Sequence, residues 1–225
     1  MSTAHAPTSQ VALDARFSAL EERLAAVEDR EAIERLQYQY GFYIDNRMWA
    51  ELAALFATDG AEMEIGRRGC YRGRERIHRF LHEVLGEGRW GLLKDEIINH
   101  LQLQPVITLA ADRQTAKARS RAIVQGNSPP GSGFFLWAEG VYENDYVKED
   151  GEWRLRRLWW VPTFYTRMAG FDQAAFQTAP ASEAFPPDAP SRPQDPALGR
   201  SFVPFHYVHP FTGARVPSPT GHFAD

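Results

Sequence analysis

Cysteine is nearly absent from the 225-residue chain, in which Cys70 is the single thiol. One thiol excludes an intramolecular disulfide framework and a cysteine-ligated metal cluster, and it is compatible with a reducing compartment. Basic residues are fewer than acidic ones, 25 against 29, so the net charge is −4. Because a nucleic-acid-binding domain normally has a clustered basic surface, this balance predicts no nucleic-acid partner.

Long apolar runs are missing as well. No stretch approaches the ~18 consecutive apolar residues of a membrane span, and the N-terminal stretch lacks the charged and apolar regions of a signal peptide. We therefore expect no membrane partner and a cytoplasmic location. No glycine-rich phosphate loop follows a predicted strand, and no cluster of histidine, cysteine and carboxylate residues has metal-ligand spacing. These absences predict that the protein uses no cofactor and no metal ion.

Aromatic residues, in contrast, are abundant: 14 Phe, 8 Tyr and 6 Trp make up 12% of the chain. The hydrophobic fraction is 44%, and a chain of this length can bury about 70% of the surface that its unfolded form exposes. Eleven of the aromatic residues lie between Phe134 and Phe171. The composition therefore predicts a folded domain with an aromatic-rich core.

The N-terminal segment carries a narrow apolar stripe. Its apolar residues follow one another in alternating steps of four and three, which places them along one side of a helix. We assign residues 1–27 as an N-terminal arm that either pairs with another copy of the chain or lies on its own domain. The stripe consists of Leu13, Phe17, Leu20, Leu24 and Val27.

The next part of the chain changes from helices to strands. Asp29 is a candidate N-cap for a second helix that ends near residues 45–46, and a short helix is expected from Trp49 to Phe56. In the break between them, polar groups can face inward. From Ala61 the apolar period becomes two, which is typical of strands. Helices followed by a meander of strands predict an α+β fold with an antiparallel sheet. The expected strands are 61–66, 99–109, 115–125, 134–147 and 153–163, with one more helix at 74–85.

Proline sets residues 172–225 apart as an irregular C-terminal extension. Ten of the 15 prolines lie between Pro180 and Pro219, which excludes regular secondary structure there. The extension also contains aromatic residues, which are unusual in a disordered tail. We therefore expect residues near 200–215 to dock as a lid or a subunit clasp, over this domain or a neighbouring one. The residues concerned are Phe202, Phe205, His206, Tyr207, His209 and Phe211.

Five sequence blocks follow one another between residues 28 and 168: EAIERL (31–36), YGFYID (40–45), WAELAALF (49–56), YRGRERI (71–77) and GVYENDYVKEDGEW (140–153). Together they resemble the SnoaL-like branch of the nuclear transport factor 2-like superfamily. The resemblance implies that residues 28–171 form a cone, in which a curved antiparallel sheet wraps around N-terminal helices and leaves a deep pocket. Members include scytalone dehydratase, steroid isomerases, polyketide cyclases, dioxygenase small subunits and bacterial lyases acting on lignin-derived aromatics, so the fold alone does not decide the reaction.

Asp45 and His100 are the main candidates for acid–base catalysis. In dehydratases of this superfamily an aspartate near the end of the first core helix, followed by a tryptophan, works with a histidine from a strand. Asp45, followed by Trp49, and His100 occupy similar positions. From the residues alone, Asp45 could equally be a helix cap and His100 a structural residue. With the resemblance, we interpret Asp45 as a base or as the residue that orients His100.

Further site residues are predicted near the same helix end and on the sheet. Tyr43 is a candidate catalytic hydrogen-bond donor. Arg121 could stabilise an oxyanion, or it could belong to a solvated stripe on the convex side of the sheet. The aromatic candidates could also be core or interface residues. The predicted substrate-binding residues are Tyr40, Trp49, Gln102, Arg121, Trp137, Trp160 and Tyr165.

These features predict a cofactor-independent lyase or dehydratase that acts on a small aromatic substrate. The favoured reaction is that of a γ-formaldehyde lyase on lignin-derived diaryl propanoids. Loss of the benzylic hydroxyl gives a quinone methide, and deprotonation of the terminal hydroxyl then expels formaldehyde to leave a stilbene. The alternatives are an isomerase, a polyketide-cyclase-like enzyme, or a non-catalytic assembly subunit like the dioxygenase small subunits. A homo-oligomer, either a dimer or a trimer, is expected.

Overall fold

One 36-residue helix, α1 (Gln10–Asp45), stands where the sequence predicts two. In this computed structural model, which describes residues 10–170, 182–184, 186–189 and 207–215, Asp29 lies inside the helix and is not an N-cap. No glycine or proline interrupts residues 10–40, so the helix has no reason to break. The carboxylate of Asp29 is instead buried and accepts hydrogen bonds from Lys148 Nζ (2.5 Å) and Trp153 Nε1 (2.8 Å).

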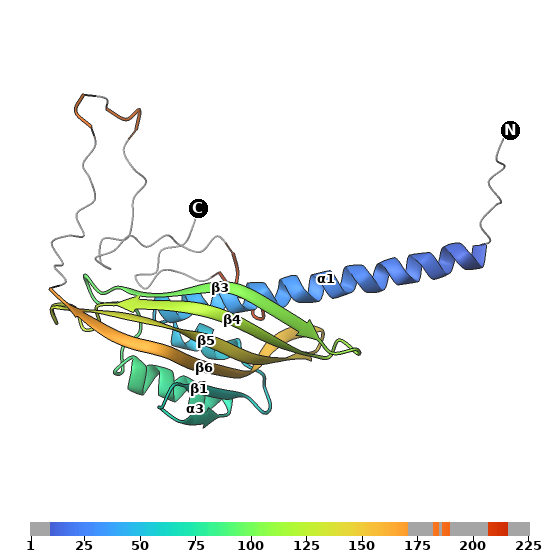
Figure 1. Ribbon diagram of the computed structural model, residues 1–225, viewed down its shortest axis with the longest axis horizontal. Coiled ribbons are helices and arrows are strands. Elements are labelled where there is room, and N and C mark those ends of the chain that lie inside the picture. The colour runs from blue at the N-terminus through green and yellow to red at the C-terminus, as the bar shows by residue number, and fades with distance from the viewer. Residues whose placement is uncertain (1–9, 171–181, 185, 190–206, 216–225) are drawn as a thin grey trace.

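The N-terminal half of α1 projects beyond the sheet (Figure 1). The apolar stripe from Leu13 to Val27 is exposed along its whole length. The expectation that the arm lies on its own domain is therefore wrong, because α1 continues straight outward past the end of the sheet (Figure 1).

In the described part of the chain, nine further elements follow α1. One short helix precedes the first two strands and another follows them. The second of these helices continues into a π-helical segment. Strand β1 and the predicted long strands are present, with β2 as an additional short strand. The bounds are α2 (Trp49–Ala54), β1 (Glu62–Ile65), β2 (Cys70–Arg72), α3 (Arg74–Arg79), η1 (Phe80–Leu85), β3 (Ile98–Leu109), β4 (Thr115–Gly126), β5 (Phe134–Glu149) and β6 (Glu152–Ala169).

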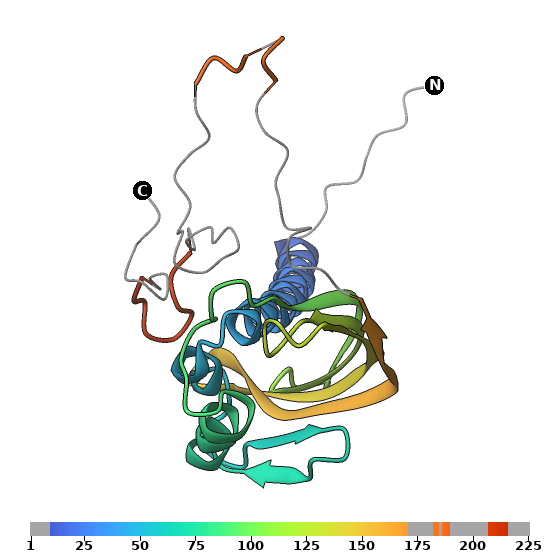
Figure 2. The same ribbon diagram turned by 90° about the vertical axis from the view of Figure 1, so that its left-hand side faces the viewer.

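The six strands form one sheet in the order β2-β1-β6-β5-β4-β3. Every neighbouring pair is antiparallel except β1 and β6, which run parallel, so the sheet is not purely antiparallel as expected. Register shifts interrupt β3 near Pro105 and the β5–β6 pair near Gly140. Because such bulges bend a strand, they support the curvature with which the sheet wraps around the C-terminal half of α1 (Figure 2).

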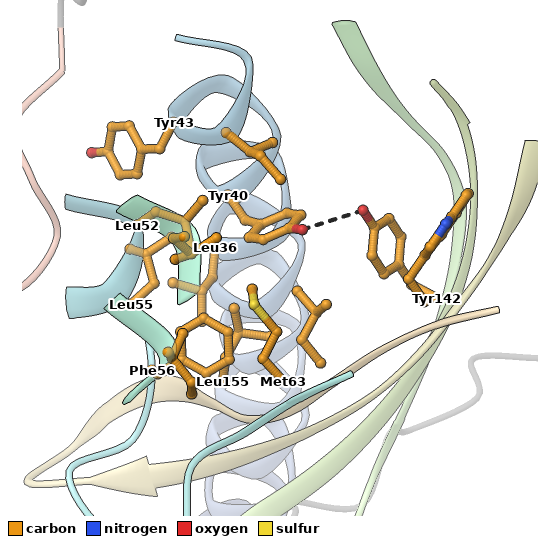
Figure 3. Close-up of a cluster of buried hydrophobic side chains, with 14 of the residues drawn as sticks. Leu36, Tyr40, Tyr43, Leu52, Leu55, Phe56, Met63, Tyr142 and Leu155 are labelled. Carbon is orange, nitrogen blue, oxygen red and sulfur yellow. Dashed lines mark hydrogen bonds between the residues drawn. The ribbon is translucent and has the colours of Figure 1, made fainter. Parts of the chain in front are cut away.

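The main core lies between the helices and the concave face of the sheet. Leu36, Leu52, Phe56, Met63 and Leu155 meet there and are almost completely buried (Figure 3). Burying one such side chain stabilises the fold by about 1.5–3 kcal/mol. The core therefore fixes α1 and α2 against the sheet, and these elements carry the site described below.

Residues 207–215 of the C-terminal extension dock on the same chain. His209 is 3% exposed and its ring stacks on Tyr43, with 5.9 Å between the ring centroids. The ring of Phe211 lies under the guanidinium of Arg154 at 3.8 Å. This part of the extension thus covers the outer side of α1 and α2. The other predicted docking residues, Phe202, Phe205 and His206, lie outside the described residues.

Candidate active site

A cavity of about 270 Å³ lies between the C-terminal end of α1 and the concave face of the sheet. Its wall is mainly apolar and aromatic, as in most small-molecule sites. None of residues 207–215 lines it, so the docked part of the extension is not a lid over this cavity. Five aromatic side chains contribute to the wall: Tyr40, Trp49, Tyr142, Trp160 and Tyr165.

Asp45 and His100 meet at the edge of this cavity. Nδ1 of His100, on β3, lies 2.8 Å from Oδ1 of Asp45, at the end of α1, and each side chain is only 14% exposed. His100 lines the cavity, whereas Asp45 lines a groove on the other side of the contact, between α1 and β3. An ionised carboxylate can only accept a hydrogen bond, so in a contact between a carboxylate and a neutral imidazole Nδ1 is the donor and Nε2 keeps its lone pair. This geometry suits His100 to take a proton from a molecule in the cavity.

Gly41 allows the strand that carries His100 to approach α1 closely. A Cβ atom at Gly41 would lie 3.2 Å from the backbone oxygen of His100 and 3.0 Å from Cγ of Gln102. Both distances are shorter than ordinary van der Waals contact, so a larger residue would push β3 away. The glycine four residues before Asp45 therefore helps to set the distance between the two polar groups.

Three tyrosines place hydroxyl groups around the cavity. The hydroxyls of Tyr40 and Tyr142 lie 3.3 Å apart (Figure 3), and burial raises the pKa of both phenols, so both stay protonated. Nε1 of Trp160 donates to the hydroxyl of Tyr165 at 2.9 Å, which leaves the Tyr165 proton for another acceptor. These groups can donate hydrogen bonds to an oxygen or other polar atom of a substrate. Tyr142 is a site residue that the sequence analysis missed.

Tyr43, predicted to be catalytic, does not line the cavity. Its side chain points away from Tyr142 (Figure 3) and stacks on His209 of the docked extension. Successive helix residues are rotated by about 100°, so Tyr43 lies to one side of the row formed by Tyr40 and Ile44, which do line the cavity. The prediction for Tyr43 is therefore corrected: its position suits anchoring of the extension.

Three predicted substrate-binding residues also lie outside the cavity. Gln102 accepts a hydrogen bond from Gln37 at 2.8 Å and lines the groove on the α1 side of β3. Arg121 is on the outer face of the sheet, where its exposed guanidinium pairs with Glu139 at 2.8 Å. Trp137 is 40% exposed on that same face. Alternation along a strand predicts which residues share a face, but it does not tell which face is concave. The other four, Tyr40, Trp49, Trp160 and Tyr165, line the cavity.

A buried ion pair behind the cavity wall, of which Arg47 lines the cavity and Glu96 does not, was also missed by the sequence analysis. Arg47 has a positive φ of 53° just after α1, and its Nη2 lies 2.6 Å from Oε1 of Glu96 and 2.9 Å from Oγ of Ser128. Burial alone would raise the pKa of Glu96, but hydrogen bonds from Leu93 N–H and Ser128 and the charge of Arg47 hold it below its ordinary value. The break at 43–48, where polar groups can face inward, was the available signal for Arg47. No sequence pattern marks Glu96 as its partner.

The fold and the site together define a curved-sheet α+β domain in which a histidine and an aspartate are in contact at an aromatic-walled cavity. The chain belongs to the SnoaL-like domain family, whose sequence model matches residues 25–158, and so to the nuclear transport factor 2-like superfamily. No curated protein sequence matches the chain. Within the described residues, no helix is long and apolar enough to cross a membrane.

Several solved structures have a similar fold. A candidate scytalone dehydratase from Novosphingobium aromaticivorans DSM 12444 is 24% identical with a TM-score of 0.54, covering 63% of this chain and 88% of that one. A type 2 hexachlorocyclohexane dehydrochlorinase, LinA, is 23% identical with a TM-score of 0.58, covering 70% and 97%. LinA-type3 from Novosphingobium barchaimii LL02 is 22% identical with a TM-score of 0.57, covering 66% and 96%. At these identities the similarity establishes the fold.

Proposed function

We propose that the protein is a cofactor-independent lyase that eliminates a small leaving group from a hydrophobic substrate. The observation that carries this proposal is the His100–Asp45 pair, whose imidazole lines an aromatic-walled cavity. Fold relatives that carry the names dehydratase and dehydrochlorinase support the reaction class by analogy.

In the proposed reaction, Nε2 of His100 removes a proton from the carbon next to the one that bears the leaving group. The C–H electron pair becomes the new double bond, and the leaving group departs with its own electron pair. Asp45 stabilises the imidazolium that forms, as a carboxylate beside a catalytic histidine does. The proton then passes to the departing group or to water, which restores neutral His100.

The buried phenols supply the acid side of this reaction. Tyr142 and Tyr165 lie on neighbouring strands of the cavity wall, and the hydroxyl of each can donate a hydrogen bond. A hydrogen bond to a departing oxygen or halide stabilises the negative charge that develops on it, and this effect is larger in a site that excludes water. The acid function is therefore assigned to these tyrosines and not to Tyr43.

The cavity size bears on the choice of substrate. An apolar cavity of about 150 Å³ holds one benzene molecule, so about 270 Å³ encloses one substituted ring. For a lignin-derived diaryl propanoid, the second ring would extend through the open end of the cavity. His100 would then take the proton of the terminal hydroxyl, releasing formaldehyde and leaving a stilbene after the benzylic hydroxyl has gone as water.

An assay with two substrate sets tests the proposed elimination and, separately, the proposed diaryl propanoid substrate. One set holds one-ring compounds with a hydroxyl or halide next to an acidic C–H, and the other holds diaryl propanoids. Wild-type protein is expected to release water, halide or formaldehyde and form a conjugated alkene. His100→Ala should lower turnover at least about 100-fold with an unchanged melting temperature. Arg119→Ala, on the exposed outer face, is the matched control. Full activity of His100→Ala, or products of unchanged mass, which indicate isomerisation, would contradict the proposal.

A further inference from the structure

The projecting half of α1 has an exposed apolar stripe that the fold leaves uncovered. Its side chains are between 36% and 60% exposed, although each is large and apolar. Burial of such surface is favourable, and exposed contiguous apolar surface commonly marks an interaction site. The stripe residues are Leu13, Phe17, Leu20, Leu24 and Val27.

The spacing of the stripe is that of a coiled coil. If Phe17 and Leu24 take heptad position a, then Leu13, Leu20 and Val27 take position d. This 3.5-residue repeat keeps one seam facing a partner helix of the same kind. The segment from Leu13 to Val27 is about 22 Å long at 1.5 Å per residue. Because it continues into the buried half of α1, the domain already supplies the nucleus that an isolated short helix would lack.

Charged residues flank the seam with opposite signs on its two sides. Arg16 and Arg23 occupy g positions, whereas Glu21 and Glu28 occupy e positions. None of the four has an oppositely charged residue three or four positions away in its own helix. In a parallel pair of helices, each g residue faces the e residue five positions later on the partner, which joins arginine to glutamate twice on each side. An antiparallel pair would instead bring arginines together and glutamates together.

We propose that this half of α1 pairs with the same segment of a second copy of the chain as a parallel two-stranded coiled coil. The apolar seam supplies the attraction and the charge pattern selects both the partner and the direction. The domains of the two copies then lie at the same end of the coil.

Disulfide cross-linking of full-length protein tests the direction of the pairing. In a Cys70→Ser background, Leu13→Cys places a thiol at a d position near one end of the seam. Parallel pairing brings the two thiols together, so with oxidised glutathione as the oxidant a disulfide-linked dimer should form at micromolar protein concentration. Ala15→Cys, at an outward f position, is the matched control and should cross-link at least about tenfold more slowly. Absence of the Leu13→Cys dimer, or equal rates for the two variants, would overturn the proposal.

A charge exchange tests the specificity of the same pairing. Adding Arg23→Glu to the Leu13→Cys protein places glutamate opposite Glu28 of the second copy. We expect the cross-linking rate to fall several-fold, and the further change Glu28→Arg should restore it. The arm is exposed, so neither change alters the buried core. Equal rates in all three proteins would show that the charges do not direct the pairing and would overturn that part of the proposal.

The charge of the cavity carries a second inference, which rests on the proposed function. Arg47, Arg68 and Arg167 line the cavity, and its lining contains no aspartate or glutamate; Glu96, which pairs with Arg47, lies behind the wall. Arg68 and Arg167 are exposed, and neither forms an ion pair with any described residue. Nε of Arg47 is buried without a hydrogen-bond partner in the described part of the chain. We infer that the substrate carries an anionic group, such as a carboxylate, which Arg68 and Arg167 bind.

Binding of two probes of the same shape tests this inference without any turnover. Cinnamate carries a carboxylate, and cinnamamide is its neutral counterpart. By calorimetry at low salt, cinnamate should bind at least about tenfold more tightly, and the Arg68→Gln/Arg167→Gln protein should lose the preference. Equal affinities, including no binding of either probe at millimolar concentration, would overturn the inference. Because binding alone is measured, this result is separate from failure of the proposed elimination.

Discussion

Replacing Asp45 by asparagine perturbs the orientation of His100 while nearly preserving the volume of the side chain. The contact between Oδ1 of Asp45 and Nδ1 of His100 is 2.8 Å long, and both side chains are 14% exposed. A hydrogen bond to a charged group at such a site contributes about 1.5–3 kcal/mol. Asparagine removes the charge, and its amide N–H can donate to Nδ1. The imidazole proton then moves to Nε2, which can no longer act as a base.

The expected loss follows from these values. A difference of about 2.7 kcal/mol in the stability of the transition state lowers the rate about 100-fold. We therefore expect Asp45→Asn to lower kcat/KM at least about 100-fold on whichever substrate the assay above identifies. Asp59→Asn removes a carboxylate from an exposed loop and serves as the matched control.

Nitrogen-15 NMR of labelled histidine follows the cause directly. In wild-type protein the neutral ring of His100 should carry its proton on Nδ1, and in Asp45→Asn a large share should carry it on Nε2. The reasoning is refuted if wild-type His100 is protonated on Nε2. It is also refuted if Asp45→Asn keeps full turnover.

Two further predictions concern stability. Gly140→Ala would place a Cβ against the backbone oxygen of Val161 and 2.7 Å from the ring of Trp160, so overpacking should cost about 1–3 kcal/mol. Calorimetry should show a melting temperature lower by about 2–12 °C, and an unchanged value would contradict the close packing at this bulge. Burial lowers the pKa of His209 below its ordinary value, so folding favours the neutral ring and docking of residues 207–215 is fully stable only above about pH 6.5. The protection factors for amide hydrogen exchange in these residues should therefore fall as the pH drops below that value. The same pH dependence in His209→Gln would exclude His209 as the cause.

Much of the fold could be predicted because its signals are local. Alternating apolar residues indicated the long strands, and the stripe from Leu13 to Val27 indicated a helix. The predicted start of a second helix at Asp29 was wrong. Aspartate is a common N-cap residue, and the sequence alone does not distinguish a cap from a buried hydrogen-bond acceptor. The partners of Asp29 are Lys148 and Trp153, which lie more than one hundred residues away, and no local pattern reveals them. Tertiary contacts therefore decided between a cap and a buried acceptor.

The candidate site could be predicted only in part. The resemblance to the SnoaL-like family pointed to Asp45 and His100, and the structure places these two side chains in contact. Their catalytic roles remain proposals that the assays above test. Residue type does not show which sheet residues face the cavity, because both faces of this sheet carry aromatic and charged residues. Arg121 and Trp137 face outward, whereas Trp160 faces the cavity, and only the direction of curvature separates them.

A structure with a bound substrate analogue tests the central claim most directly. The account predicts a ligand ring inside the aromatic-walled cavity, with the carbon that loses its proton about 3–3.5 Å from Nε2 of His100. A polar substituent should contact Tyr142 or Tyr165. A ligand bound instead in the groove on the Asp45 side of the contact, or one whose reacting carbon lies beyond the reach of His100, would contradict it.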